Sequence, residues 1–233
     1  MVLWYNMQPV GVIRMEKELF HVHVDEKNNK NHKWKVNNII TVGADFDSIM
    51  SKRHNSFNSC VDTVDGNTHE LMPIYQYIAS VFGQINDDTV IKGEKLELIK
   101  EMLLNCYNIV YNDNFFKREA GLEECRKDNF SSSPSRLHSI YLCDEDGLEY
   151  WTDAISMCRT KDVSIFKVLA DGNIFKSNEQ LLPVETCTYG QTYSGAFKYW
   201  NPKFDSVPSC TNEYLVQGKV KVLECIKKIE KIK

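Results

Sequence analysis

The chain has 233 residues, of which 42% are hydrophobic and 11% aromatic, and its formal net charge is −4 at pH 7. This apolar content is enough for a packed core and excludes a globally disordered chain. The 28 basic and 32 acidic side chains are interspersed, so a general nucleic-acid binder held by one basic face is disfavoured. The eight cysteines contain no C-x-x-C pair, which argues against a zinc site.

Nothing at the N-terminus has the basic-then-apolar pattern of a secretory signal, and no apolar run approaches the ~18 residues of a membrane span. We therefore expect a cytoplasmic protein with free thiols and no membrane association. Residues 1–17 are expected to be an N-terminal extension, and residues 18–233 a single domain.

The first elements follow from short patterns. Residues 18–24, ELFHVHV, alternate apolar and polar side chains and predict a strand. Residues 34–43, WKVNNIITVG, indicate a short strand or helix that ends in a turn. Residues 45–69 are polar and predicted to be irregular, with turn chemistry in DGNTHE.

A helical block is expected over about residues 71–130. A first helix is predicted over residues 71–85, beginning near Pro73, and one long or two consecutive helices over residues 93–130. The second segment has a continuous apolar stripe that we expect to lie in the core: Leu96, Leu98, Ile99, Met102, Leu103, Cys106, Ile109 and Val110.

The C-terminal half is rich in predicted strands. Pro134 ends the helical block, LHSIYLC then alternates as a strand, and EDGLEYWTDAISMC indicates a turn into a helix. VSIFKVLA and IFKSNEQLLP are expected to form a hairpin around DGN, residues 171–173. SGAFKYW predicts a short helix or a helical turn, in which we expect Tyr199 and Trp200 to be core residues, and EYLVQGKVKVLEC predicts a final strand. The order predicts an α+β protein with antiparallel sheets.

Three strings place chemically capable side chains on expected strands: LFHVH with His21, SIYLCDEDGLEYW with Tyr141, and NEYLV with Glu213. Singly, each has an ordinary explanation as a packed or solvated residue. In this order they resemble the ADP-ribosyltransferase fold, in the branch related to diphtheria toxin and the poly(ADP-ribose) polymerases, which uses a His, a Tyr and a Glu. NEYLV is the most specific match, since that branch has N-E-Y-I-V. The resemblance covers roughly residues 18–43 and 131–224.

The resemblance implies split antiparallel sheets around an NAD cleft, with the helical block as an insertion and NAD as the substrate. Breaking the nicotinamide–ribose bond passes through an oxocarbenium-like state, which the Glu213 carboxylate would stabilise. Tyr141 would pack against the nicotinamide ring, and His21 would hydrogen-bond the ribose hydroxyls. The three side chains are expected to converge in the cleft, and no metal is needed.

Three further residues are implied in binding NAD. The polymerases have a glycine directly after the histidine, where this chain has Val22, whose backbone groups would contact the nicotinamide amide. His23 lies on the same strand face as His21, so either histidine fits, and we prefer His21. Arg136 would clamp the diphosphate, since a guanidinium grips an anion bidentately, or would form an ordinary ion pair.

The leading interpretation is a mono-ADP-ribosyltransferase, of the kind found in toxins and effectors, that transfers ADP-ribose to a macromolecular acceptor, either protein or nucleic acid. Two alternatives stay open. One is a catalytically inactive module of the same fold that binds a nucleotide or a protein. The other is an NAD glycohydrolase, in which water replaces the acceptor.

Overall fold

A computed structural model describes residues 12–24, 34–46, 60–65, 68–73, 94–156, 162–184 and 188–230. These residues belong to two compact units. The larger unit combines Met1–Lys52 with Arg118–Lys233, and the smaller is Arg53–Lys117. Each unit is described by itself below.

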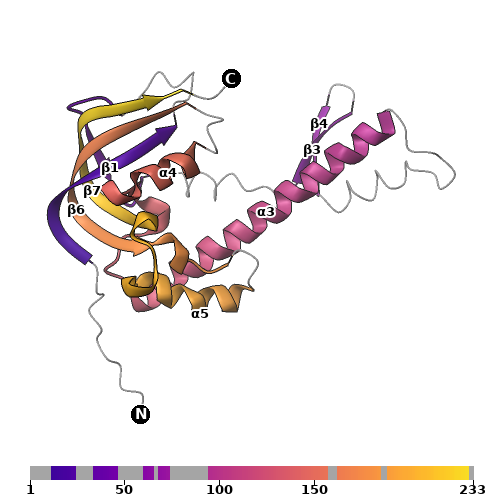
Figure 1. Ribbon diagram of the computed structural model, residues 1–233. Helices are drawn as coiled ribbons and strands as arrows, with labels where there is room; N and C mark the ends of the chain where they lie inside the picture. The colour runs from indigo at the N-terminus through magenta and orange to yellow at the C-terminus, as the bar shows by residue number, and fades with distance from the viewer. Residues whose placement is uncertain are drawn as a thin grey trace, which may run out of the picture. The chain divides into compact units, whose positions relative to one another are not determined.

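The described residues form an α+β structure, as the sequence predicts (Figure 1). Strands alternate with helices and with short 3₁₀ turns, in the following order: β1 (Val12–Val24), β2 (Ile39–Val42), β3 (Cys60–Asp65), β4 (Thr68–Pro73), α3 (Glu94–Asn129), η1 (Arg136–His138), β5 (Ile140–Leu142), η2 (Glu145–Gly147), α4 (Leu148–Ile155), β6 (Val163–Asn178), η3 (Glu179–Leu181), α5 (Tyr189–Trp200), η4 (Phe204–Ser206), η5 (Ser209–Thr211) and β7 (Asn212–Ile229).

The larger unit is built on one five-stranded antiparallel sheet of order β1-β6-β7-β2, in which β5 also pairs with β7. The long strands β1, β6 and β7 lie side by side and bend strongly (Figure 1). The sheet curls so far that β1 meets the end of β5, where Phe20 and Cys143 exchange two backbone hydrogen bonds of 2.9 Å. The described residues of the larger unit thus form one curled sheet where we expected two facing sheets.

A pair of glycines permits the bend. Gly172 of β6 lies opposite Gly218 of β7, with φ of +143° and +147°. A Cβ at Gly172 would lie 2.4 Å from the carbonyl oxygen of Gln217, so any other residue would clash in addition to straining the backbone. The expected DGN turn is therefore wrong: residues 171–173 continue one 16-residue strand. Glycine permits a bend within a strand as readily as a turn, and local sequence does not distinguish the two.

The two faces of the curled sheet bury different cores. The inner face packs apolar side chains of all five strands together, with Trp34 and Phe46 packed against them. This core consists of Leu19, Ile40, Val42, Ile140, Leu142, Phe166, Val168, Ala170, Ile174, Tyr214, Val216, Val220 and Val222. The outer face packs against the end of α3 and against α5: Leu122, Cys125, Phe130, Phe175, Ala196, Tyr199, Trp200 and Leu215. Side chains that alternate along β7 therefore enter different environments.

The smaller unit contains the β3–β4 hairpin and the first part of α3. The prediction of irregular structure over residues 45–69 is wrong where β3 and β4 pair, because polar strands lack the alternation that would reveal them. The predicted helix over residues 71–85 is wrong for its first three residues, which end β4, and its remainder lies outside the described residues.

The predicted long helix is confirmed as α3, but its apolar stripe is not core throughout. Met102 is buried, whereas Leu96, Leu103 and Val110 are 41%, 59% and 59% exposed. Helical periodicity shows which residues share a face and not what covers that face.

Among the helices that can be described, none is long and apolar enough to cross a membrane. The described residues also contain no cluster of three or more His, Cys, Asp or Glu side chains arranged to hold a metal ion.

Candidate functional site

Glu213 is the second residue of β7, which lies between β6 and β5 in the sheet. The strand is held where it begins: the Trp151 indole donates to the Asn212 carbonyl at 2.8 Å, and the Asn178 amide donates to the Asn212 side chain at 3.0 Å. Glu213 points to the outer face, like Leu215 two positions on, and is only 4% exposed. A carboxylate with so little contact with water requires donors from the protein.

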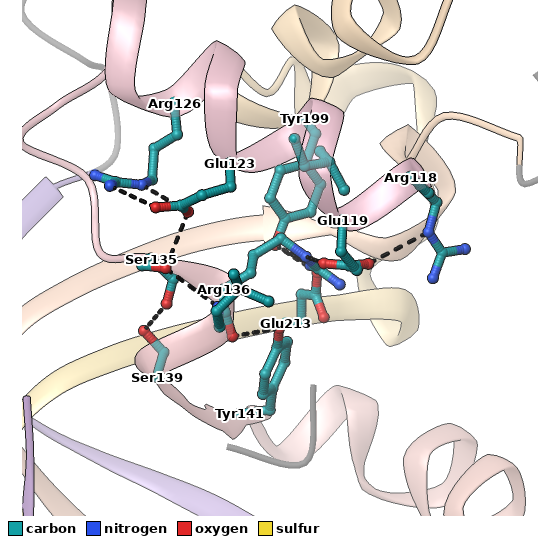
Figure 2. Close-up of polar contacts among 12 residues, drawn as sticks. Arg118, Glu119, Glu123, Arg126, Ser135, Arg136, Ser139, Tyr141, Tyr199 and Glu213 are labelled. Carbon is teal, nitrogen blue, oxygen red and sulfur yellow. Dashed lines mark hydrogen bonds and ion pairs between the residues drawn. The ribbon is translucent and has the colours of Figure 1, made fainter. Parts of the chain in front are cut away.

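Arg136 and Tyr199 supply those donors (Figure 2). The Arg136 Nη1 donates to Glu213 Oε1 at 2.6 Å, and the Tyr199 hydroxyl donates to the same oxygen at 2.6 Å. Arg136 also donates from Nε to Glu119 Oε2 at 3.0 Å and from Nη1 to the Tyr199 oxygen at 2.6 Å. One buried guanidinium therefore lies between two buried carboxylates and an aromatic hydroxyl.

A second layer of contacts fixes the turn that carries Arg136. Ser135 caps η1 by accepting from the Leu137 amide, and its hydroxyl donates to Glu123 of α3 at 2.9 Å. Arg126, one turn further along α3, pairs with Glu123 at 2.8 Å. The position of Arg136 is thus set from the last turns of α3, which also supply Glu119 (Figure 2).

The electrostatics of this cluster are those of a cation held by anions away from water. Burial alone would lower the pKa of Arg136, but Glu119, Tyr141, Tyr199 and Glu213 together raise it well above its ordinary value. Burial raises the pKa of both Tyr141 and Tyr199 well above the ordinary value, against the opposing effect of Arg136. Both tyrosines are therefore neutral hydrogen-bond donors near neutral pH.

Tyr141 joins the same cluster. It lies directly opposite Leu215 in the β5–β7 pairing, so its side chain shares the outer face with Glu213. Its hydroxyl donates to the Arg136 carbonyl at 2.9 Å, and its ring centre is 5.3 Å from the guanidinium carbon. The structure thus brings together Glu213, Tyr141 and Arg136, although the guanidinium is committed to carboxylates.

His21 does not converge with these residues. It points to the inner face of the sheet, like Leu19, and stacks on Trp34 with ring centres 3.7 Å apart. Within the described part of the chain, His21 is linked to the cluster through the backbone: its Nδ1 donates to the Tyr141 carbonyl at 3.1 Å. Burial lowers the pKa of His21 to about 3, so the ring is neutral at pH 7. The expected convergence is therefore wrong for His21.

Strand alternation explains this outcome. His23 shares the inner face, with its ring centre 5.8 Å from that of His21. Val22 lies on the opposite side, is 6% exposed, and pairs with Ile165 in the β1–β6 ladder. A motif shows that a histidine is in a strand, but the pairing register decides which face it occupies.

Three residues in or beside the site could not be assigned from sequence motifs. Glu119 is 1% exposed and Tyr199 is fully buried, as expected for a core residue, but both have polar roles. Tyr150 of α4 makes a short hydrogen bond to Glu179, which with burial raises its pKa to about 12, and Glu213 lies close enough to contribute. The sequence alone does not show that an acid within a helix, such as Glu119, is buried in a site, because that depends on a partner that is distant in the chain.

Comparison with known proteins identifies the family. Residues 19–230 match the family described as "Protein of unknown function (DUF2441)", and the chain belongs to this family. The match includes all the site residues named above. No protein in the curated set of characterised sequences matches the chain significantly.

Proposed function

We propose that this member of the DUF2441 family has an ADP-ribosyltransferase-like fold and acts as a mono-ADP-ribosyltransferase, transferring ADP-ribose from NAD to a protein or nucleic-acid acceptor. The observation behind the proposal is the adjacency of the three motif strands. Strand β7 with Glu213 pairs with β5, which carries Tyr141, and the end of β5 bonds to β1 beside His21. These strands come from the N-terminal, middle and C-terminal parts of the chain, and Tyr141 and Glu213 share one face.

The chemistry assigned to Glu213 is electrostatic. When nicotinamide leaves with the electron pair of the glycosidic bond, positive charge develops on the ribose, and a carboxylate in a poorly hydrated site stabilises that charge strongly. The hydrogen bonds from Arg136 and from Tyr199 both end on Oε1 of Glu213, so neither of these two donors occupies Oε2. We assign Oε2 to a ribose hydroxyl, and the half-buried ring of Tyr141 to the nicotinamide.

The other expected NAD contacts fit less well. His21 and His23 face the inner core, so we assign neither a contact with NAD. His21 instead positions β5 through the Tyr141 carbonyl. Arg136 holds Glu213 and Glu119, which makes it a positioning residue for the carboxylate and replaces its expected role as a diphosphate clamp.

A second candidate is an inactive module of the same fold that binds a nucleotide or a protein. The enclosure of Glu213 favours it, because the carboxylate is 4% exposed and already paired with a cation. In this case the carboxylate would stabilise the fold and take no part in bond breaking.

One matched pair of variants separates the two candidates. Glu213→Gln and Glu119→Gln each remove one carboxylate partner of Arg136, but only Glu213 lies on the motif strand. The full chain would be incubated with NAD labelled in the ADP-ribose part, and both nicotinamide release and label on macromolecules would be measured below the melting temperature of each variant. We expect Glu213→Gln to lose about 10²–10³-fold in turnover and Glu119→Gln to stay within a few-fold of the parent.

Each outcome assigns a function. Free labelled ADP-ribose without labelled macromolecules would indicate a glycohydrolase. NAD binding in calorimetry without nicotinamide release from the parent would favour the inactive module. Equal losses in the two variants would show that the cluster acts only by stabilising the fold, and the catalytic assignment of Glu213 would be withdrawn.

A further inference from the structure

A second polar cluster lies on the other face of β7 from Glu213. We call it the Lys17 cluster, and it consists of Lys17 on β1, Asp144 after β5, Lys176 on β6 and Tyr214 on β7. The Lys17 Nζ donates to the Tyr214 hydroxyl at 3.0 Å and lies 4.1 Å from the ring centre. The Tyr214 hydroxyl donates to Asp144 Oδ2 at 3.0 Å, and the Lys176 Nζ is 3.8 Å from the same oxygen.

The cluster has two cations and a single carboxylate. Among the described residues no ion pair joins Lys17 to an acid, and its hydrogen-bond partner is a neutral phenol. Lys176, and not Lys17, forms the ion pair with Asp144, and its Nζ also lies 5.4 Å from the centre of the Tyr214 ring. Tyr214 is only 3% exposed, and Lys17 itself is half-buried against it. The ring face attracts an ammonium, but the loss of water around the amine favours its neutral form.

Burial, followed by the nearby charge of Lys176, lowers the pKa of Lys17 against the opposing effect of Asp144. A lysine that is partly desolvated and next to another cation is the arrangement that activates amines for imine formation. An ordinary surface lysine has neither feature.

We propose that Lys17 is a nucleophilic amine that forms an imine with a small aldehyde or ketone bearing an anionic group. The Lys17 nitrogen attacks the carbonyl carbon, a C–N bond forms, and the π electron pair moves to oxygen. A proton passes from nitrogen to that oxygen through the Tyr214 hydroxyl, giving a carbinolamine. The nitrogen lone pair then forms the C=N bond as the C–O bond breaks, and the departing hydroxide takes a proton from Tyr214 and leaves as water. The second proton of the nitrogen restores the Tyr214 hydroxyl, so one amine and one carbonyl compound give one imine and one water.

The neighbours have distinct roles in this proposal. Asp144, which accepts from the Tyr214 hydroxyl, takes up and returns the proton that the phenol relays. Lys176 attracts the anionic group of the carbonyl compound. The proposal does not depend on ADP-ribosyl transfer, since Tyr214 and Glu213 point to opposite faces of β7.

The test is reductive trapping on the full chain. The protein would be incubated with glyoxylate, an aldehyde that carries a carboxylate, and with cyanoborohydride, whose hydride reduces the imine to a stable amine. Peptide mass spectrometry would then follow labelling at each lysine. Lys167 is the internal control, because it pairs with Glu18 at 2.9 Å and that hydrogen bond raises its pKa. Since the neutral fraction of an amine changes about tenfold per unit of pKa, Lys17 should be labelled at least several-fold faster than Lys167.

Two conservative variants test the mechanism. Tyr214→Phe keeps the ring and removes the relay, so labelling of Lys17 should fall several-fold. Lys176→Met should reduce the preference of Lys17 for glyoxylate over propanal, an uncharged aldehyde. Thermal melting would confirm that both variants are folded. The proposal would be overturned if Lys17 were labelled no faster than Lys167. It would also be overturned if the ratio of the two labelling rates were the same in both variants as in the parent.

Discussion

Replacing Glu213 by Gln should destabilise the protein measurably, whatever its effect on catalysis. An acid at the start of a strand is usually solvated, and its substitution then changes stability by no more than about 0.5 kcal/mol. Here the carboxylate is 4% exposed and accepts two hydrogen bonds of 2.6 Å from Arg136 and Tyr199. The change therefore removes a buried charge that has a buried partner.

The size of the effect follows from these two bonds. A hydrogen bond to a charged group contributes about 1.5–3 kcal/mol and a neutral one about 0.5–1.5 kcal/mol. Because Gln keeps an acceptor oxygen, each bond weakens by about 1 kcal/mol, and the free energy of unfolding should fall by about 2 kcal/mol. Glu119 still balances Arg136, so the loss should stay below the about 3–5 kcal/mol expected when a buried charge loses its partner entirely.

Urea unfolding followed by circular dichroism would measure this loss. The same substitution in an Arg136→Met background is the control, because the charge-assisted bond is already absent there. We expect the effect of Glu213→Gln to be at least about 1 kcal/mol smaller in that background. A loss below about 0.5 kcal/mol in the parent, or equal losses in both backgrounds, would refute the view that this ion pair stabilises the fold.

Two further predictions concern the sheet itself. The folded pKa of His21 is about 3 against an ordinary 6.5, so the unfolded chain binds a proton that the folded chain does not, and stability should fall as pH drops from about 6.5 toward 3. His21→Phe should reduce this slope, which is at most about 1.4 kcal/mol per pH unit in urea titrations. Gly172→Ala should destabilise by at least about 3 kcal/mol, since its Cβ would lie 2.4 Å from a carbonyl oxygen. Gly190→Ala, in α5 with nothing within 4 Å, should be neutral or stabilising, and thermal melting would compare the two.

Local patterns were sufficient for most elements around the site. The strands that carry His21, Tyr141 and Glu213 could be predicted because their apolar alternation is regular over several residues. α4 could be predicted because turn residues precede it, whereas SGAFKYW predicted only the C-terminal part of α5, which begins at Tyr189. Long-range facts could not be predicted, since one sequence contains no pairing register: the face occupied by His21 and the bend at Gly172 both depend on which strand lies alongside.

The same limit applied to the polar partners of the site. Arg136 was visible as a candidate anion binder, but a guanidinium can bind a phosphate or a carboxylate equally well. Only the fold shows that its partners are Glu119, from a helix, and Glu213, from a strand. Tyr199 was expected in the core for its ring, and its hydroxyl could not be assigned a partner without the position of β7.

The helical block takes on a larger part than the sequence indicated. As a variable insertion it should be dispensable for the site, yet α3 supplies Glu119 to Arg136 and Glu123 to the cap of η1. These contacts lie in the last turns of α3, which belong to the larger unit, whereas the exposed apolar stripe lies in the smaller one. The α3 side chains that hold the carboxylate cluster and the cap of η1, Glu119 and Glu123, therefore lie in the C-terminal turns of the helix. Substitution of Glu119 should accordingly disturb Glu213 through their shared partner Arg136, and substitution of Glu123 should do so through the cap of η1.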